Sequence, residues 1–222
     1  MEKLTIDKID EKEVLRYLGQ KGDAPLTKNV DELLKKAIKQ TLDIINPRAV
    51  HAMFSIEELK NADLLSGSDI IEHLKGCSHA ILIALTLGTE AEQKIRSAQT
   101  TDVLFPVMLD ACASVSIEAV CDKYCENLSS LYSKDSLYLT SRFSPGYGDF
   151  PIEKQHILLR LVDAGRKIGL CATNSSILTP RKSITAIIGV SDVPVAGKMA
   201  GCKNCALKDK CDYKNKGATC NV

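Results

Sequence analysis

Residues 142–151 read RFSPGYGDFP, and this stretch interrupts the helical patterns on either side of it. Its two prolines lack the backbone N–H that a helix needs, and its two glycines favour turns with positive φ. We therefore predict an irregular, stiffened loop that starts at Arg142 and bends at Tyr147. Such a loop is either a tight connection between two elements or a binding loop whose glycines let a ligand approach the backbone closely.

Composition places the chain among ordinary globular proteins. The 222 residues are 45% hydrophobic and 26% charged, with a net charge of +1. This charge gives no strong field toward nucleic acid or an anionic membrane. The N-terminus lacks the apolar core of a signal peptide, and no apolar run reaches the roughly 20 residues of a membrane span. We expect a cytoplasmic protein without a nucleic-acid or membrane partner.

Helices and strands are interspersed along the chain. Apolar periodicity and end signals predict helices over 11–18, 29–45, 68–75, 89–98, 102–131 and 152–167, and strands over 49–56, 80–87, 169–173 and 183–190. The last two strands could form a hairpin through a turn at 179–182. Without a βαβ rhythm, this order indicates an α+β fold with a twisted antiparallel or mixed sheet and flanking helices. No glycine-rich fingerprint supports a dinucleotide fold or a P-loop, and the four isolated histidines form no Ser–His–Asp arrangement.

The longest helical pattern, 102–131, carries a carboxylate on its small, apolar face. A projection at 100° per residue puts Glu118 near the middle of this face, which comprises Leu104, Val107, Ala111, Ser114, Cys121 and Cys125. A buried carboxylate is costly unless something pairs with it. Glu118 therefore belongs to a structural ion pair, lies on a less buried face than the projection indicates, or faces a cationic ligand.

The nine cysteines fall into two groups. Five of them have apolar neighbours and are interpreted as core residues: Cys77, Cys112, Cys121, Cys125 and Cys171. The other four lie close together near the C-terminus: Cys202, Cys205, Cys211 and Cys220. We accordingly predict one domain over 1–195, followed by a Cys-rich metal-binding tail over 196–222.

The 142–151 stretch resembles a known motif. Arg-x-x-x-Gly-Tyr, then a proline and a helix carrying Gln155, is similar to the S-adenosylmethionine-binding motif in the activation domain of cobalamin-dependent methionine synthase. The downstream run IGLCATNSSILTPRKSITAIIGVSD resembles that domain's next segment, a hairpin with a Thr-Pro turn. The upstream run LDACASVSIEAVCDKYCENL resembles its long helix. The likeness extends from about residue 102 to 192.

The resemblance implies a role for each matching residue. Arg142 would pair with the carboxylate of S-adenosylmethionine, which suits a planar guanidinium. Ser144 and Gly146 would offer backbone groups to the adenine, and Tyr147 would pack beside it. Glu118 would face the cationic end of the ligand. In the reaction that the resemblance implies, the protein only has to position its ligand, so no catalytic residue is expected.

Two departures from the family pattern stand out. The family has a ligand-contacting aromatic residue after its last strand, where this chain reads VPVAGKMAGC. We also expect the protein to stand alone, without the corrinoid-binding, homocysteine-binding and folate-binding modules. The family uses an aspartate near its start, but the residues around Asp10 do not support a match there, so Asp10 is left out of the site.

The resemblance also implies a function. Free-standing proteins of this kind look like activators that restore an oxidised corrinoid enzyme by reductive methylation. The methyl donor would be S-adenosylmethionine, and the cobalamin would sit on the partner, a corrinoid-binding methionine synthase or a related methyltransferase. A reductant such as flavodoxin or ferredoxin would supply the electron. The protein would thus be a component of methyltransferase reactivation. The alternative is a regulatory or scaffold protein with a metal-bound tail.

The C-terminal cysteines have the spacing C-x2-C-x5-C-x8-C. Four thiolates complete the coordination of either a structural zinc or a [4Fe-4S] cluster. Zinc sites more often pair two C-x2-C segments, and the reaction needs an electron that a cluster could relay. We therefore favour the cluster over zinc, while a flexible tail with free thiols is the third possibility.

Anaerobic purification tests the tail. We expect a brown protein with broad absorbance at about 400 nm that bleaches with dithionite, because thiolate-ligated clusters absorb there and accept electrons. Metal analysis of the variant Cys202→Ser/Cys205→Ser should show loss of the metal. A colourless protein with one zinc per chain would refute the cluster.

Overall fold

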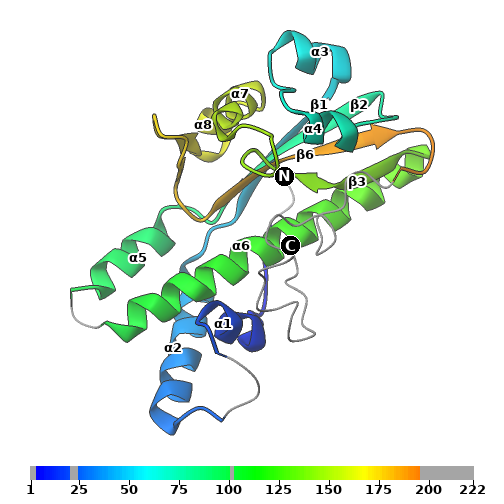
Figure 1. Ribbon diagram of the computed structural model, residues 1–222. Helices are drawn as coiled ribbons and strands as arrows, with labels where there is room; N and C mark the ends of the chain where they lie inside the picture. The colour runs from blue at the N-terminus through cyan, green and yellow to red at the C-terminus, as the bar shows by residue number, and fades with distance from the viewer. Residues whose placement is uncertain (1–3, 21–24, 101–102, 196–222) are drawn as a thin grey trace. The chain divides into compact units, whose positions relative to one another are not determined.

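The computed structural model describes residues 4–20, 25–100 and 103–195 (Figure 1). The chain divides into two compact units. Among the described residues, unit 1 comprises those within 4–50, 84–128 and 163–184, and unit 2 comprises 51–83, 129–162 and 185–195. The predicted tail over 196–222, with all four of its cysteines, lies outside the described residues. Its separation from a domain over 1–195 stays a prediction.

Helices and strands alternate irregularly along the chain, as the sequence predicts. The first half contains α1 (Glu11–Tyr17), α2 (Lys28–Ile44), β1 (Arg48–Ser55), α3 (Ile56–Asn61), α4 (Ser68–His73), β2 (His79–Thr86) and α5 (Glu90–Ala98). The second half contains α6 (Leu104–Tyr132), η1 (Ser133–Asp135), β3 (Tyr138–Phe143), η2 (Ile152–Lys154), α7 (Gln155–Leu161), α8 (Ala164–Ile168), β4 (Cys171–Ala172), β5 (Leu178–Thr179) and β6 (Ser183–Ser191).

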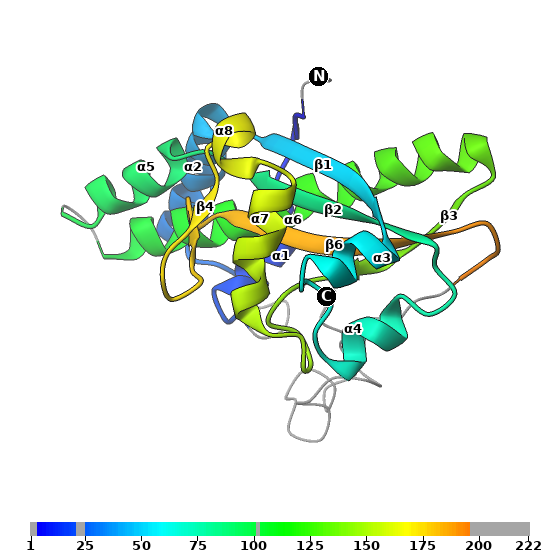
Figure 2. The ribbon, with the colours of Figure 1, turned by 90° about the horizontal axis from the view of Figure 1, so that it is seen from above.

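The main sheet has four strands in the order β1-β2-β6-β3, which Figures 1 and 2 show side by side. β3 and β6 are antiparallel. Backbone bonds beyond the strand ends give the direction of the β1–β2 pair. Asn46 N–H donates to Leu87 C=O, and Ile56 N–H donates to Ser78 C=O, so residue numbers rise on one strand as they fall on the other. The bonds Ser78–Val190 and Leu87–Lys182 show the same for β2 and β6. The α+β prediction with an antiparallel sheet is confirmed.

The predicted hairpin of the last two strands is wrong. β6 lies between β2 and β3 in the main sheet, and β4 pairs with β5 in a separate two-stranded ribbon. The ribbon turns at 173–177, where Thr173 N–H donates to Ile177 C=O over 2.8 Å. The Thr173 hydroxyl accepts from Ile177 N–H as well, the kind of local bond that favours a turn. The turn therefore comes before β5, rather than at the Thr-Pro pair.

The predicted helix over 152–167 is broken in two. Asp163 separates α7 from α8 and has the left-handed φ of 57°. Aspartate tolerates this conformation better than most residues, and the Asp163 carboxylate accepts from Arg166 Nε over 2.8 Å. The sequence pattern does not reveal the break, because both short helices bury apolar residues and the apolar spacing continues from one to the other.

Two elements were not predicted. The strand β3 was not predicted because its register shifts between Leu139 and Arg142, and this shift disturbs the alternation of apolar and polar residues. α3 escaped because it is short. Ser55 and Glu58 form a capping box at its start, with the Ser55 hydroxyl accepting from Glu58 N–H over 3.2 Å.

The core of unit 1 lies among α1, α2, α5 and the first turns of α6. Its buried members include Val14 from α1, Leu34 from α2, Ala98 from α5 and Met108 from α6. α1 begins where predicted, because the Asp10 carboxylate accepts from Lys12 N–H over 2.9 Å. By length and composition α6 could cross a membrane, but 67% of its most apolar window is buried in the protein, as in a core helix.

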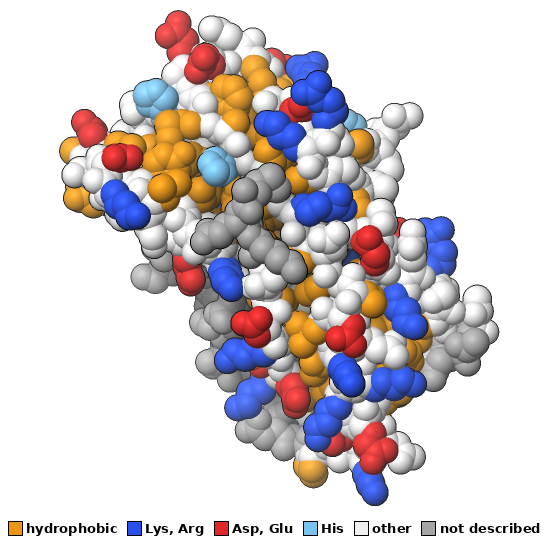
Figure 3. Space-filling view, turned by 180° about the vertical axis from the view of Figure 1, so that it is seen from behind, with side chains coloured by type: hydrophobic (Ala, Val, Ile, Leu, Met, Phe, Trp, Pro, Cys, Tyr) orange, Lys and Arg blue, Asp and Glu red, His pale blue; other side chains and the backbone are white. Residues whose placement is uncertain are grey.

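Charged side chains are intermixed on the surface. On the face shown in Figure 3, Lys and Arg side chains of the described residues are interspersed with Asp and Glu. Exposed pairs such as Lys35–Asp31, 2.8 Å apart on α2, connect some of them. Pairs of this kind contribute little to stability, but neighbouring opposite charges weaken any field of one sign.

The five cysteines with apolar neighbours are not all core residues. Cys112 and Cys121 are buried, Cys77 and Cys125 are half-buried, and Cys171 is exposed. The prediction is wrong for Cys171, because β4 belongs to a two-stranded ribbon with little to cover it. Burial raises the pKa of the Cys112 thiol to about 11, which keeps it protonated and unreactive.

A buried polar group links three segments of unit 2. The Thr140 hydroxyl donates to Ser141 C=O over 2.9 Å, accepts from Gly189 N–H over 2.8 Å, and lies 3.0 Å from His73 Nε2. Thr140 and His73 thus form a buried hydrogen bond between β3 and α4. The shifted part of β3 is thus hydrogen-bonded to β6 and α4.

The backbone at Gly189 leaves no room for a side chain. A Cβ atom there would lie 2.5 Å from Cys77 Sγ and 3.0 Å from Thr140 Cγ2. We expect Gly189→Ala to lower the free energy of unfolding by about 1–3 kcal/mol, measured by chemical denaturation, because the packed core must shift.

A second substitution identifies the clash as the cause. Cys77→Ala removes the nearest atom, so the double variant should recover part of the loss. Gly165→Ala is the matched control, since its Cβ would meet nothing nearer than Cys171 Sγ at 3.6 Å. An equal loss in Gly189→Ala with and without Cys77→Ala would contradict this explanation.

Candidate functional site

The segment that carries the sequence motif begins at the end of β3 and continues into the loop before η2. Arg142 is the second-last residue of β3, opposite Ile188 of β6, and its side chain is half-buried. The neighbouring Phe143 is buried, so β3 alternates in burial at this point. The strand pairing thus fixes the backbone from which Arg142 projects.

The loop is closed by its own backbone bonds. Gly146 N–H donates to Phe150 C=O over 2.8 Å, Tyr147 N–H donates to Ser144 C=O over 3.2 Å, and Phe150 N–H donates to Tyr147 C=O over 3.0 Å. Ser144 C=O and Gly146 N–H are therefore already engaged within the loop. A tight, irregular loop is present as predicted, but its predicted start at Arg142 is wrong, because Arg142 and Phe143 still belong to β3.

Both glycines have the positive φ that the sequence predicts, +93° at Gly146 and +55° at Gly148. They also have packing reasons to lack a side chain. A Cβ atom at Gly146 would lie 3.0 Å from Ile152 Cδ1, and one at Gly148 would collide with the Asp69 carboxylate. The space beside these glycines is taken up by the protein itself.

Aromatic packing holds the loop against unit 2. The Phe150 ring is 1% exposed and stacks on Phe143, with centroids 6.3 Å apart. Phe143 also contacts His73, 5.1 Å away, and Tyr147, 6.4 Å away. Tyr147 remains 49% exposed, so its ring is anchored at one side and open to solvent at another, as a contact for a flat ligand requires.

A single carboxylate ties the loop to α4. Asp149 accepts from Ser68 N–H over 2.7 Å, from the Ser68 hydroxyl over 2.6 Å and from Asp69 N–H over 2.9 Å. The N-cap position of α4 is Gly67, which has no side chain to do this. Asp149 caps the helix from another part of the chain, and the hydrogen bonds from Ser68 and Asp69 hold the pKa of its carboxyl below the ordinary range.

The motif's Gln155 has a structural role in unit 2. It is buried at the start of α7, which lies beside β6 in Figure 2, and its Oε1 accepts from the Thr185 hydroxyl over 3.0 Å. This bond fixes the first turn of α7 against the sheet. Since α7 follows the loop directly, Gln155 stabilises the far end of the loop.

Glu118 lies on α6, in unit 1, and is half-buried. The predicted burial of its helix face is wrong at the start of the helix, where Leu104 is 44% and Val107 52% exposed. α6 is buried on other sides as well, so a single-face projection does not identify its covered surface.

Four of the five predicted ligand contacts are thus brought together. Arg142, Ser144, Gly146 and Tyr147 share one continuous segment of unit 2, while Glu118 belongs to unit 1. Within the described residues, no group of three or more His, Cys, Asp or Glu side chains could hold a metal ion.

Comparison with solved structures identifies the architecture. The chain is similar to the MetH reactivation domain in its crystal structure bound to AdoHcy, with a TM-score of 0.61 and 17% sequence identity. The match covers 95% of this chain and 82% of that chain. This chain has the fold of the MetH reactivation domain. No family model matches the sequence, and no curated protein matches it.

The reactivation-domain fold agrees with the resemblance seen in the sequence. What sequence reasoning missed was Asp149, which it treated as one more loop residue. The contact joins residues 80 and 81 positions apart, and local pattern carries no signal for it. Asp149 is a positioning residue for the loop rather than a predicted ligand contact.

Asp149→Asn should destabilise the protein near neutral pH, because an amide offers α4 no negative charge and one acceptor oxygen fewer. A carboxyl whose pKa is lowered by folding stabilises the folded state above its unfolded pKa, and this stabilisation is lost as pH falls through the folded value. The difference in free energy of unfolding between wild type and variant should therefore shrink below about pH 4.

Chemical denaturation across this pH range measures the difference. Glu153→Gln is the control, as an exposed acid of η2 in the same unit. If the Asp149→Asn difference stays constant from neutral to acid pH, the charge of Asp149 is not what holds the loop.

Proposed function

We propose that this protein binds S-adenosylmethionine and supports the reductive methylation of a corrinoid methyltransferase such as methionine synthase. The observation that carries the proposal is the short segment formed by the end of β3 and the loop after it, which presents Arg142 and Tyr147 in a reactivation-domain fold. The crystal structure with this fold has AdoHcy bound, the product that S-adenosylmethionine leaves after methyl transfer.

The residues of the loop suit the parts of this ligand. The Arg142 guanidinium offers a planar pair of donors to the ligand carboxylate. Tyr147 offers an exposed aromatic face beside the adenine. Because Gly146 N–H is engaged by Phe150, we assign the adenine contact to the carbonyl of Gly146, which can accept from the exocyclic amine. Glu118 would complement the positive charge of the ligand.

The corrinoid on the partner protein is a substrate in this reaction. One electron reduces cob(II)alamin, S-adenosylmethionine then gives its methyl group to cobalt, and the broken C–S bond leaves S-adenosylhomocysteine. Cobalt is the nucleophile, so the work of this protein is to orient the sulfonium methyl group. Orientation of two reactants can contribute on the order of 7–11 kcal/mol to lowering a barrier.

The electron requires a donor, a flavodoxin- or ferredoxin-type protein. The four C-terminal cysteines, proposed as ligands of a [4Fe-4S] cluster or of zinc, would relay the electron in the first case and stabilise the tail in the second. Four thiolate donors suit either a [4Fe-4S] cluster or a zinc ion.

Isothermal titration calorimetry tests the binding site. We expect S-adenosylmethionine and S-adenosylhomocysteine to bind, and Arg142→Ala to weaken both by roughly 2–4 kcal/mol, because the ligand carboxylate loses its partner. Methylthioadenosine lacks that carboxylate, so its affinity should hardly change in the same variant. Arg160→Ala, another arginine of unit 2 that is exposed on α7, should bind like wild type.

The carboxylate on α6 is tested by Glu118→Gln, with Glu126→Gln on the same helix as control. Weaker binding at an unchanged melting temperature supports a ligand contact. A lower melting temperature at unchanged affinity identifies a structural ion pair. Absence of binding to the metal-replete protein at millimolar ligand would refute the proposal and leave the regulatory or scaffold function.

A further inference from the structure

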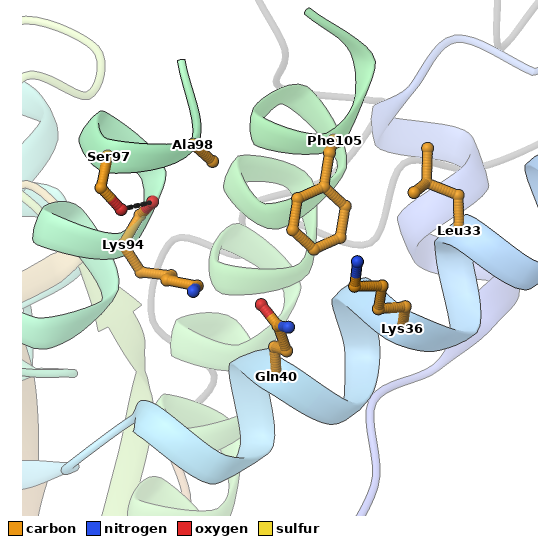
Figure 4. Close-up of a pocket in the computed structure, with 7 residues that line it drawn as sticks. All are labelled: Leu33, Lys36, Gln40, Lys94, Ser97, Ala98 and Phe105. Atoms are coloured by element: carbon orange, nitrogen blue, oxygen red, sulfur yellow. Dashed lines mark hydrogen bonds between the residues drawn. The ribbon is translucent and has the colours of Figure 1, made fainter. Parts of the chain in front are cut away.

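A pocket lies within unit 1, among α2, α5 and the start of α6. Figure 4 shows this pocket of about 300 Å³, a volume at the lower end of the range for small-ligand sites. It is lined by Leu33, Lys36, Gln40, Lys94, Ser97, Ala98 and Phe105. None of these residues belongs to the segment 142–147, so a ligand in this pocket would be independent of the proposed function.

Two ammonium groups reach this pocket from different helices. Lys36 extends from α2 and Lys94 from α5, and Figure 4 shows both side chains directed into the space between the helices. The Lys36 ammonium lies over the ring of Phe105, 5.1 Å from its centroid, and this cation–π contact limits its motion. None of the seven described residues that line the pocket is acidic, so the positive charges are not offset within it.

The Gln40 side chain gives an independent indication of a ligand. Its Oε1 is buried, and no described residue donates a hydrogen bond to it. Buried polar atoms nearly always have a partner, because desolvation without a hydrogen bond is costly. In Figure 4 this amide extends from α2 toward the same space as the two ammonium groups. A bound molecule that carries an N–H or O–H group would satisfy it.

We propose that this pocket binds a small phosphate monoester that also carries a hydroxyl group. The phosphate dianion would lie between Lys36 and Lys94, since lysine binds phosphate as a point charge and two ammonium groups match two negative charges. The hydroxyl of the ligand would donate to Gln40 Oε1. The small volume selects a compact molecule of this class, such as a phosphorylated polyol of three carbons.

Titration of the full chain with glycerol 3-phosphate, inorganic phosphate and glycerol tests this site by calorimetry. Glycerol 3-phosphate should bind saturably and more tightly than inorganic phosphate, and glycerol alone should not bind. Lys36→Gln and Lys94→Gln should each weaken glycerol 3-phosphate binding about tenfold, the usual effect of losing one charged hydrogen-bond partner. Lys39→Gln, an exposed lysine of α2 that does not line the pocket, should have no effect.

Gln40→Leu separates the two parts of the proposed ligand. This variant should bind glycerol 3-phosphate only about as tightly as inorganic phosphate. Its affinity for inorganic phosphate should be the same as in the wild type. It should also raise the melting temperature of the ligand-free protein, because it removes an unpaired buried oxygen. Circular dichroism confirms that each variant is folded. Absence of saturable binding, or equal weakening by Lys39→Gln and Lys94→Gln, would overturn the proposal.

Discussion

The Asp149 carboxylate connects the loop after β3 with the first turn of α4, and the candidate site depends on this connection. Loops with two glycines are costly to order, and three hydrogen bonds from Ser68 and Asp69 hold this loop in place. The carboxylate also stabilises the start of α4, since the helix's own N-cap residue, Gly67, has no side chain to cap it. One charge therefore satisfies a helix terminus and fixes the backbone that presents Tyr147.

The sheet provides the second constraint. β6 lies between β2 and β3, so Arg142 projects from a strand whose position is set by its pairing with β6. The buried hydroxyl of Thr140 satisfies polar groups where the register of β3 shifts, just before Arg142. The arginine and the loop are thus supported by hydrogen bonds on both sides, from the shifted strand before them and from Gln155 after them. A rigid support of this kind is what a reaction that depends on orientation requires.

The protein carries two different kinds of polar chemistry. In unit 2, one arginine at the end of β3 and an exposed aromatic ring in the following loop share one short segment, a combination suited to a zwitterionic ligand with a flat ring system. In unit 1, two lysines and an unpaired amide oxygen surround a small hollow, a combination suited to a compact dianion. The near-neutral net charge of +1 gives no indication of either combination, because binding would depend on which charges share a local surface rather than on their sum.

The sequence by itself determined the local features of this protein. The apolar period placed α2 and α6, the continuous apolar run placed β2, and Gly146 and Gly148 gave the loop its positive φ values, because each depends on residues close together in the chain. Four predicted ligand contacts could be named for the same reason, since Arg142 to Tyr147 form one short motif. Tertiary structure alone decided that β6 pairs with β2 and β3, that the start of α6 exposes Leu104 and Val107, and that Asp149 caps α4. These features depend on which distant segments pack against each other, and the periodicity of a single segment does not indicate its packing partner.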